Sequence, residues 1–517
     1  MAIIKINITI RKSYEHDCEP EKHSVMYDTG LNLSLSDILI KNNIIVNTPC
    51  GGNGLCGKCN VVINGASIKS CTYFPCDSDN NICIELPEES LISYDNTIND
   101  SDSFSSTSEL NSEISKNVEC HSKKLAVDIG STSITMCITD SDKVIDTLTF
   151  LNPTASYGAD VVSRIQASIN GKKEALQASL INGLTTNLKR ITSKNRLNIT
   201  EFTDIYIACN STMEHLLYGL DCKGLSSYPF TLSKAEKDLY ILGLKVVTFP
   251  HFSAFVGGDI MSGLYYIDDS EPYILLDLGT NAEMALYNKG TYYVTSASAG
   301  PAFEGTSISC GCAYVPGAIN NISVSPAKAS SFRCTYNTID NKLPTGICGS
   351  GIVMLYSELI RLGIVDNYGT LCDNYIDIGF PVANTPVGQL TITQNDIRQL
   401  ILALAAIKSG LQILLEKSGC NPRSIKKIYI SGSFGKALNT DILSNINMFP
   451  DELLKGTDIC FSGNTSLKGA IKYSMSHDSE NDATKVQNII SNCQEIHLAN
   501  EETFEKIFIG NMVYMKI

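Results

Sequence analysis

The feature that most constrains this chain is a group of cysteines near its N-terminus. Cys50, Cys56 and Cys59 fall within one loop, and Cys71 follows after a short run that contains Asn64-Gly65. Glycines fill most of the space between the first two cysteines. Glycine adopts φ values that other residues resist, so it lets backbone amides turn inward around a bound anion or cluster. The loop therefore predicts a bound metal centre.

The spacing of the thiols favours an iron–sulfur cluster. The first three cysteines have the pattern C-x5-C-x2-C. A 2Fe-2S cluster takes four Cys thiolates, three of them from one loop in the plant-type arrangement. We therefore expect Cys71 to be the fourth ligand, with Cys76 or Cys83 as alternatives. A disulfide-bonded or zinc-binding loop is the competing interpretation, but structural zinc sites usually carry two separated C-x2-C pairs, whereas this loop has one.

The segment around these cysteines, residues 1–87, resembles a β-grasp ferredoxin. Apolar and polar side chains alternate over most of residues 3–10, which predicts a half-buried strand. Its hairpin partner is expected at residues 24–27, a short helix at 34–42, and further strands at 61–63 and 82–86. The resemblance implies a small α+β domain that holds a 2Fe-2S cluster.

Length and charge limit what the rest of the chain can be. The 517 residues are too many for one domain, and 43% hydrophobic with 18% charged residues is typical of a soluble globular protein. The net charge of −14 argues against nucleic acid as a partner, because phosphate binding requires a basic surface. No secretory signal pattern opens the chain, and the longest apolar run, residues 400–407, is far short of the roughly 20 that span a bilayer. We therefore expect a cytoplasmic protein with reduced thiols and no membrane contact.

A change of composition marks residues 88–122 as a linker. The segment is rich in Ser and acidic residues, lacks hydrophobic periodicity, and contains Lys116 as its only basic residue besides His. Such a composition predicts a flexible acidic segment with an end-to-end distance of about 30 to 35 Å. That reach would let the N-terminal domain visit more than one docking place. The alternative is a linker that packs in a single position.

A motif that occurs twice predicts two related lobes after the linker. In each copy an apolar strand ends in Asp, a turn of Gly and small polar residues follows, and a second strand returns. The first copy is Asp128 with Gly130, Ser131 and Thr132, and the second is Asp277 with Gly279, Thr280 and Asn281. Each copy presents a carboxylate and backbone amides to a phosphate–metal complex. Two copies in one chain indicate two lobes that face one nucleotide.

A third motif completes the pattern. A helix over residues 394–417, with a capping box formed by Thr393 and Asp396, is expected to end at Gly419. The strand 427–430 then runs into a glycine turn that contains Gly432, Ser433 and Gly435, and glycines there allow a flat ligand such as adenosine to approach. The three motifs together resemble the superfamily of acetate and sugar kinases, heat-shock chaperones and actin, and no P-loop is present. The predicted fold is thus α/β overall, with a two-lobed, RNase H-like (actin-like) ATPase over residues 123–517, its first lobe about 123–265 and its second about 270–517.

Further segments resemble the reductive activators of corrinoid-dependent enzymes. They are spread over residues 123–440 and read YGADVVSR from Tyr157, NSTM from Asn210, VGGD from Val256, SAGPAFEG from Ser298, ISCG from Ile308 and GICGSG from Gly346. The resemblance implies an ATP-dependent enzyme that returns the cobalt of a corrinoid protein from inactive Co(II) to Co(I). A plant-type 2Fe-2S centre lies near about −400 mV, and Co(I) is a strong reductant, so ATP would drive an unfavourable electron transfer.

The resemblance also implies roles for individual residues. Asp128 and Asp277 would hold Mg²⁺ through water, and the turns that follow them would contact the phosphates. Asp259 or Glu283 would orient the attacking water, while Gly432, Ser433 and Gly435 would line the adenosine. The expected partners are a corrinoid protein or corrinoid-dependent methyltransferase and a reduced ferredoxin or flavodoxin-type donor, and relatives suggest a homodimer.

Two other functions remain open on the sequence alone. The same ATPase fold also occurs in small-molecule kinases, in which case the N-terminal domain would be a redox regulator, and a non-hydrolysing redox-sensing scaffold would bind nucleotide without turnover. The C-x-C pair Cys310 and Cys312 is expected to be structural rather than metal-binding. His215 and His251 are expected to be packing or surface residues.

Overall fold

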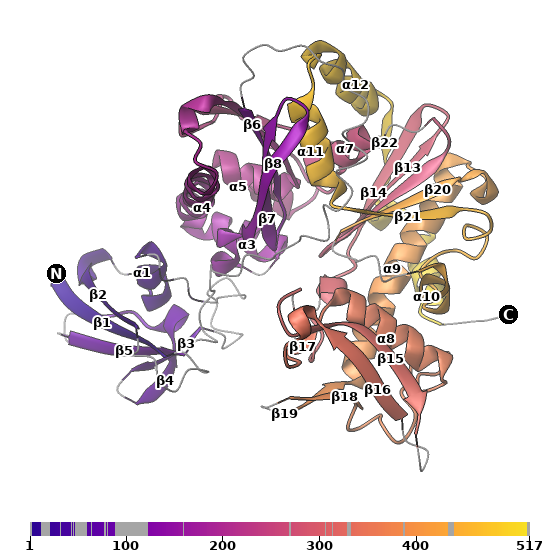
Figure 1. Ribbon diagram of the computed structural model, residues 1–517, viewed down its shortest axis with the longest axis horizontal. Coiled ribbons are helices and arrows are strands. Elements are labelled where there is room, and N and C mark those ends of the chain that lie inside the picture. Colours follow the sequence, from indigo (N-terminus) through magenta and orange to yellow (C-terminus); the bar gives the residue numbers. More distant parts are fainter. Residues whose placement is uncertain are drawn as a thin grey trace.

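The structure is a computed structural model of the chain (Figure 1). It describes residues 3–11, 21–31, 33–42, 44, 46, 59–63, 65–76, 79, 81–87, 123–158, 160–267, 270–304, 307–312, 314–327, 332–385, 388–432 and 439–513. The expected linker, residues 88–122, lies outside the described residues.

The N-terminal unit is a five-stranded sheet with one helix. Its strands lie in the order β2-β1-β5-β3-β4, and the alternating side chains of β1 bury Ile4, Ile6 and Ile8 on one face. The strand pairing of β1 with β2 is antiparallel and that of β1 with β5 is parallel. The predicted strands and helix are confirmed, whereas β4 was not anticipated. The elements are β1 (Ile3–Arg11), β2 (Glu21–Asp28), α1 (Leu35–Lys41), β3 (Asn60–Ile63), β4 (Ala66–Lys69) and β5 (Asn81–Pro87).

The first lobe is built on a six-stranded sheet in the order β10-β11-β9-β6-β7-β8. β6, which carries Asp128, lies between the parallel strand β9 and the antiparallel strand β7. Its strands are β6 (Lys123–Ile129), β7 (Ser133–Asp140), β8 (Lys143–Leu151), β9 (Phe202–Cys209), β10 (Tyr240–Ile241) and β11 (Leu244–Thr248). Its helices are α3 (Val161–Ala167), α4 (Lys173–Lys194), α5 (Ser211–Tyr218) and α6 (Lys223–Ser226).

The second lobe repeats this arrangement, in the order β21-β20-β12-β13-β14-β22. β12, which carries Asp277, again lies between a parallel strand, β20, and an antiparallel strand, β13. The duplicated motif thus correctly predicted two sheets of related topology. The elements are β12 (Tyr273–Leu278), β13 (Ala282–Asn288), β14 (Thr291–Ala297), β20 (Lys427–Ser431), β21 (Asp458–Gly463), β22 (Cys493–Glu495), α9 (Gln394–Ser418), α10 (Thr440–Asn445) and α13 (Phe504–Asn511).

A smaller unit is inserted between β14 and α9 and lies below the second lobe in Figure 1. It combines the sheet β16-β15-β17 with the hairpin β18-β19 and the helix α8, which packs on β15. α8 begins at Gly349, within the GICGSG segment. The elements are β15 (Ala318–Pro326), β16 (Phe332–Thr338), β17 (Gly346–Ile347), α8 (Gly349–Arg361), β18 (Phe380–Thr385) and β19 (Gly388–Ile392).

Two helices lie between the sheets of the two lobes: α7 (Gly258–Tyr266) and α11 (Thr465–Met475). α11 comes from the last part of the chain, yet it packs on β6, β7 and β9 of the first lobe as well as on α7. Gly469 of α11 meets the Ser262 carbonyl of α7 so closely that a Cβ would lie 2.0 Å from that oxygen. α12 (Ser479–Ser491) continues beside α7. The C-terminal segment therefore ties the two lobes together.

The longest helix, α9, is long and apolar enough to cross a membrane by length and composition alone, with a mean hydropathy of 1.4 in its most apolar window. Most of that window, 72%, is buried inside the protein. α9 packs on β13, β14 and α13. It ends at Gly419, which is in the left-handed conformation (φ 58°), and its Thr393–Asp396 capping box is present as predicted. Its apolar residues therefore serve the core of the second lobe.

Candidate functional site

Two cysteines of the N-terminal unit face each other in its core. The Sγ atoms of Cys59 and Cys71 are 3.3 Å apart, and both side chains are buried. The amide of Ser70 donates to the Cys59 carbonyl at 3.1 Å, which fixes the two backbones side by side. The alternative ligands Cys76 and Cys83 are exposed. Cys50 and Cys56 lie outside the described residues, and no group of three or more chelating side chains occurs within the described part of the chain.

Asp128 stands near the end of β6, before the first glycine turn. Gly130 is required there, since a Cβ would lie 2.9 Å from the Ser133 carbonyl. The carboxylate accepts hydrogen bonds from Asn464 Nδ2 at 2.7 Å and from Ser466 Oγ at 2.8 Å. Burial nevertheless dominates and raises the pKa of Asp128 to about 6, against the opposing effect of these two bonds.

Sequence reasoning missed Asn464 and Ser466. Both lie at the start of α11, where the Asn464 side-chain oxygen also caps the helix by accepting from the Leu467 amide at 2.8 Å. A helix cap could have been predicted from the sequence N-T-S. Its contact with Asp128, more than 300 residues away in the chain, has no local signature.

The second turn repeats the first on the facing lobe. Asp277 of β12 pairs in register with Glu283 of β13, and the Gly279 amide donates to the Asn281 carbonyl at 2.9 Å to close the turn that carries Thr280. Burial first, then the nearby carboxylates of Asp259 and Asp277, hold the pKa of Glu283 well above its ordinary value.

Asp259, in the first turn of helix α7, lies close enough to Asp128 and to Glu283 to affect the pKa values of both carboxylates. Its carboxylate accepts from the Ile260 amide at 2.9 Å, and burial raises its pKa. Its charge acts to raise the pKa values of both Asp128 and Glu283. The structure therefore brings together all four carboxylates that the sequence singled out. All four residues are half-buried.

The third motif reaches the same region through Gly432, which follows β20. Its φ of +109° is open to glycine and strained for other residues. A Cβ there would also lie 2.5 Å from the Leu278 carbonyl, beside the second turn. Ser433 and Gly435, which were predicted to line the adenosine with it, lie outside the described residues.

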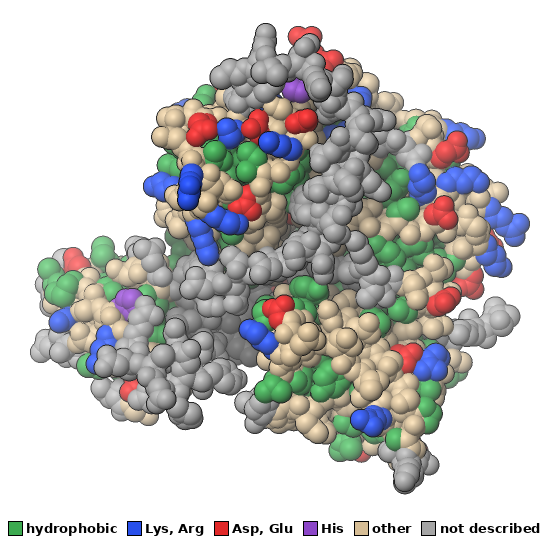
Figure 2. Space-filling model, viewed as in Figure 1, with side chains coloured by type: hydrophobic (Ala, Val, Ile, Leu, Met, Phe, Trp, Pro, Cys, Tyr) green, Lys and Arg blue, Asp and Glu red, His purple; other side chains and the backbone are tan. Residues whose placement is uncertain are grey.

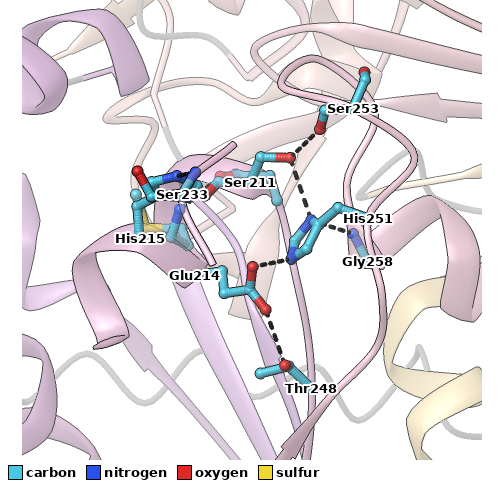
Figure 3. Close-up of polar contacts among 10 residues, drawn as sticks. Ser211, Glu214, His215, Ser233, Thr248, His251, Ser253 and Gly258 are labelled. Carbon is cyan, nitrogen blue, oxygen red and sulfur yellow. Dashed lines mark hydrogen bonds and ion pairs between the residues drawn. The ribbon is translucent and has the colours of Figure 1, made fainter. Parts of the chain in front are cut away.

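The two histidines set aside by the sequence analysis are both buried. His215 is fully satisfied: it contacts the Ser211 carbonyl at 2.7 Å and accepts from the Ser233 amide at 3.0 Å, so it fits the packing interpretation. Burial lowers its pKa. His251 instead belongs to a polar network with Ser211 and Glu214 (Figure 3). It also contacts the amide of Gly258, the residue before Asp259.

The C-x-C pair lies away from these carboxylates. Cys312 and Cys310 flank a bridge between Gly311 and Ile347. Burial raises the pKa of both thiols to about 12, so they are neutral near pH 7. Neutral buried thiols fit the structural role predicted for them.

The fold and the two facing Asp turns define the class of the protein, an actin-like ATPase with two lobes. Sequence models of one family match almost all of residues 124–517. The model described as "RACo middle region" matches residues 124–269, and the model described as "C-terminal domain of RACo the ASKHA domain" matches residues 271–517. ASKHA denotes the acetate and sugar kinase, heat-shock chaperone and actin superfamily. The chain belongs to this family of reductive activators of corrinoid proteins.

Characterised relatives carry matching names. The chain is 28% identical over 424 residues to "Corrinoid activation enzyme RamQ" of Eubacterium limosum, which covers 75% of this chain and 70% of the relative. It is 23% identical over 310 residues to "[Co(II) methylated amine-specific corrinoid protein] reductase" of Methanosarcina barkeri, covering 55% of this chain and 54% of that protein. The solved structure of "Reductive activator for corrinoid,iron-sulfur protein" shares the fold over 98% of both chains, with a TM-score of 0.67 and 23% identity.

Proposed function

We propose that this protein is an ATP-dependent reductive activator that passes an electron from a 2Fe-2S cluster in its N-terminal unit to the Co(II) corrinoid of a partner protein and thereby restores Co(I). Reductive activation of corrinoid proteins is the activity of its family. One observation supports electron transfer from a 2Fe-2S cluster in this chain. Two buried thiols, those of Cys59 and Cys71, lie 3.3 Å apart on the same chain as the two-lobed ATPase.

The thiol pair suits a cluster better than the alternatives. Two buried sulfur atoms that face each other are suitable donors for one iron of a cluster, and Cys50 and Cys56 would supply the remaining ligands from the preceding loop. Cys71 is favoured over Cys76 and Cys83 because it already lies against Cys59, whereas those two are exposed. When bound, the cluster would store the single electron that cobalt reduction requires.

The nucleotide would lie between the two Asp turns. Asp128 and Asp277 would hold Mg²⁺ through water, and Asn464 and Ser466 fix the orientation of the Asp128 carboxylate toward it. Burial first, and then the charge of Asp259, raises the pKa values of Asp128 and Glu283. A divalent cation would therefore be needed to offset the negative charge of the ionised carboxylates and of the ATP phosphates.

We propose the remaining roles as the family resemblance implies them. Residues 130–132 and 279–281 would offer amides and hydroxyls to the phosphates, and residues 432–435 would contact the adenosine. Asp259 or Glu283 would orient the attacking water. Closure of the lobes around ATP would move α7 against α11, the two helices that join them. This movement is how we expect ATP to change the grip on the corrinoid partner.

Partners outside the chain follow from the activity. A reduced ferredoxin or flavodoxin-type protein would reduce the cluster. We expect the activator itself to work in the cytoplasm, as a homodimer. Nucleic acid is not an expected partner. On the described part of the face shown in Figure 2, acidic as well as basic side chains lie on the surface of both lobes.

The decisive experiment is anaerobic visible spectroscopy of a Co(II) corrinoid protein mixed with this protein and a reductant. A Co(I) band is expected with Mg-ATP and not without it. Cys59→Ser should abolish the band while ATP binding persists, and Asp277→Asn should abolish it while the cluster persists. No ATP-dependent Co(I) band with any corrinoid partner from the same cell would refute the proposal, and a phosphorylated small-molecule product would favour a kinase instead.

A further inference from the structure

The loop of residues 249–257 leads from β11 into α7, and we call it the hinge loop. It ends directly before Gly258 and Asp259, the first residues of α7. Its first half contacts the first lobe and its middle contacts the second. Whatever holds this loop therefore sets where Asp259 stands between the two lobes.

His251 fixes the first half of the hinge loop (Figure 3). Its Nδ1 accepts a hydrogen bond from the Gly258 amide at 2.9 Å. Because a backbone amide can only donate, Nδ1 carries no proton, and the ring proton lies on Nε2. That nitrogen is 2.8 Å from Glu214 Oε2 on α5. The imidazole is thus held in one tautomer between Glu214 and the first amide of α7.

Glu214 is itself fixed and ionised. Its second oxygen accepts from the Thr248 hydroxyl at 2.9 Å. Although burial acts to raise it, the contacts with His251 and Thr248 hold the pKa of Glu214 below its ordinary value. The Ser211 hydroxyl, 3.2 Å from His251 Nδ1, donates its single proton to the Ser253 carbonyl at 2.6 Å and so braces the loop from the same helix.

The middle of the loop is attached to the second lobe. The Ser253 hydroxyl donates to the Glu495 carboxylate of β22, and the Phe255 ring lies edge-on to His497, with centroids 6.1 Å apart. A change in the angle between the lobes would therefore pull on the hinge loop. The contact between His251 and Gly258 transmits that pull to the start of α7.

We propose that the Glu214–His251 pair is a positioning device that holds the first turn of α7, and with it Asp259, in the orientation needed for ATP hydrolysis. This inference rests on the proposed function. His251 contacts the backbone amide of Gly258, the residue before Asp259, so it acts on Asp259 through the backbone of α7.

Two substitutions separate the contacts of His251. His251→Ala removes both the acceptor for Gly258 and the contact with Glu214. His251→Asn places an amide oxygen near the former Nδ1 and can still accept from Gly258. We expect His251→Ala to lower kcat for ATP hydrolysis by up to roughly 100-fold, as misplacement of a reacting group by about 1 Å does, with less than about a threefold change in Mg-ATP affinity. His251→Asn should regain much of the lost kcat.

Two Glu→Gln substitutions in the first lobe test the contact of Glu214 with His251: one removes the Glu214 carboxylate, and the other is its matched control. Glu214→Gln should lower kcat, since the neutral amide weakens the hold on His251, whereas Glu201→Gln alters a surface ion pair with Lys123 and should leave kcat unchanged. If His251→Ala lowers kcat and affinity equally, or His251→Asn restores nothing, His251 is only structural and the inference is wrong.

A second measurement does not depend on turnover. Hydrogen exchange of the amides of residues 258–260 in the nucleotide-free protein should be faster in His251→Ala and close to wild type in His251→Asn. Unchanged exchange in His251→Ala would overturn the positioning claim. If wild type binds ATP without hydrolysing it, the proposed function fails, while the exchange result still decides whether His251 holds α7.

Discussion

Asp128 illustrates how a single residue of this site is held at a cost to the fold. Its carboxylate is bound by Asn464 and Ser466 from α11, yet burial raises its pKa to about 6 from 3.8. Since one pKa unit corresponds to about 1.4 kcal/mol, ionising Asp128 in the folded protein costs roughly 2 to 3 kcal/mol. Ionised Asp128 therefore lowers the stability of the nucleotide-free fold, and the Mg-ATP that we propose it binds would offset this effect.

Asp128→Asn should consequently stabilise the nucleotide-free protein. A raised pKa contributes stability that is present below about pH 4 and is lost as the pH rises through about 6. The neutral Asn escapes that loss, so its advantage should reach roughly 2 kcal/mol in urea unfolding at pH 8 and shrink at pH 5. It should also abolish the stabilisation by Mg-ATP.

The control substitution, Asp146→Asn, should have the opposite effect on stability. Although burial opposes it, Lys194 and Asn195 hold the pKa of Asp146 below its ordinary value. Asp146→Asn should therefore be less stable than wild type at pH 8. An Asp128→Asn protein that unfolds at lower urea than wild type at pH 8 would contradict the assignment of a strained carboxylate.

The cysteines of the N-terminal unit give a second prediction at this scale. Cys71→Ser should lower the iron and acid-labile sulfide bound by anaerobically prepared protein severalfold, because its thiol faces Cys59 in the core. Cys76→Ser and Cys83→Ser alter exposed thiols and should retain both. Loss of the cluster in Cys76→Ser with retention in Cys71→Ser would reverse the ligand assignment.

At the scale of elements, the crossing of α7 and α11 is the contact that the proposed closure of the lobes would change. Besides the close approach of Gly469, Ser262 donates its hydroxyl proton to the Ser466 carbonyl at 2.6 Å. Ser466 in turn binds Asp128. The crossing thus connects the packing of two helices directly with a residue of the site.

Gly469→Ala should disrupt that crossing. The added Cβ would lie 2.0 Å from the Ser262 carbonyl, so the helices must move apart, at a cost of about 1 to 3 kcal/mol or more. Mg-ATP affinity should fall with stability, because Ser466 moves with α11. Gly510→Ala in α13 is the matched control: its Cβ would meet nothing within 4 Å, and it should be neutral or slightly stabilising in the same unfolding titration. Equal stability of the two variants would argue against a tight crossing.

The elements also show what sequence could predict and why. The two Asp turns and the Thr393–Asp396 capping box were predictable because each is made by residues close together in the chain. The contact of Asn464 and Ser466 with Asp128 was not, since it depends on how α11 crosses the first sheet. The role of His251 was hidden for the same reason: its partners Glu214 and Gly258 come from separate elements, and an isolated buried histidine is usually a packing residue.

For the whole molecule, the arrangement of the N-terminal unit against the first lobe is the remaining question. The two parts meet where α1 approaches the turn before α4. Lys172 Nζ lies 2.9 Å from Asp37 Oδ1, and Ile40 packs against the core of the first lobe. Burial first, then the Asp37 carboxylate, raises the pKa of Tyr157 in the first lobe to about 12. Among the described residues, this docking place comprises one ion pair and one apolar contact, and we propose that the N-terminal unit can leave it.

A charge reversal should therefore release the N-terminal unit, and a double reversal should restore it. Partly exposed ion pairs contribute up to about 1 kcal/mol, or roughly fivefold in population, and Lys172→Asp adds repulsion of similar size. We expect faster hydrogen exchange of α1 and of the start of α4 in Lys172→Asp. Exchange should return toward wild type in the double variant Lys172→Asp with Asp37→Lys. The difference in exchange between Lys172→Asp and wild type should be smaller at high salt. Lys194→Asp, which breaks an ion pair with Asp146 within the first lobe, should leave α1 unchanged. α1 precedes the cysteine loop in the sequence, so a unit that never leaves this contact would keep the proposed cluster beside the first lobe. Unaltered exchange of α1 in Lys172→Asp would show that the Lys172–Asp37 ion pair does not hold the unit there.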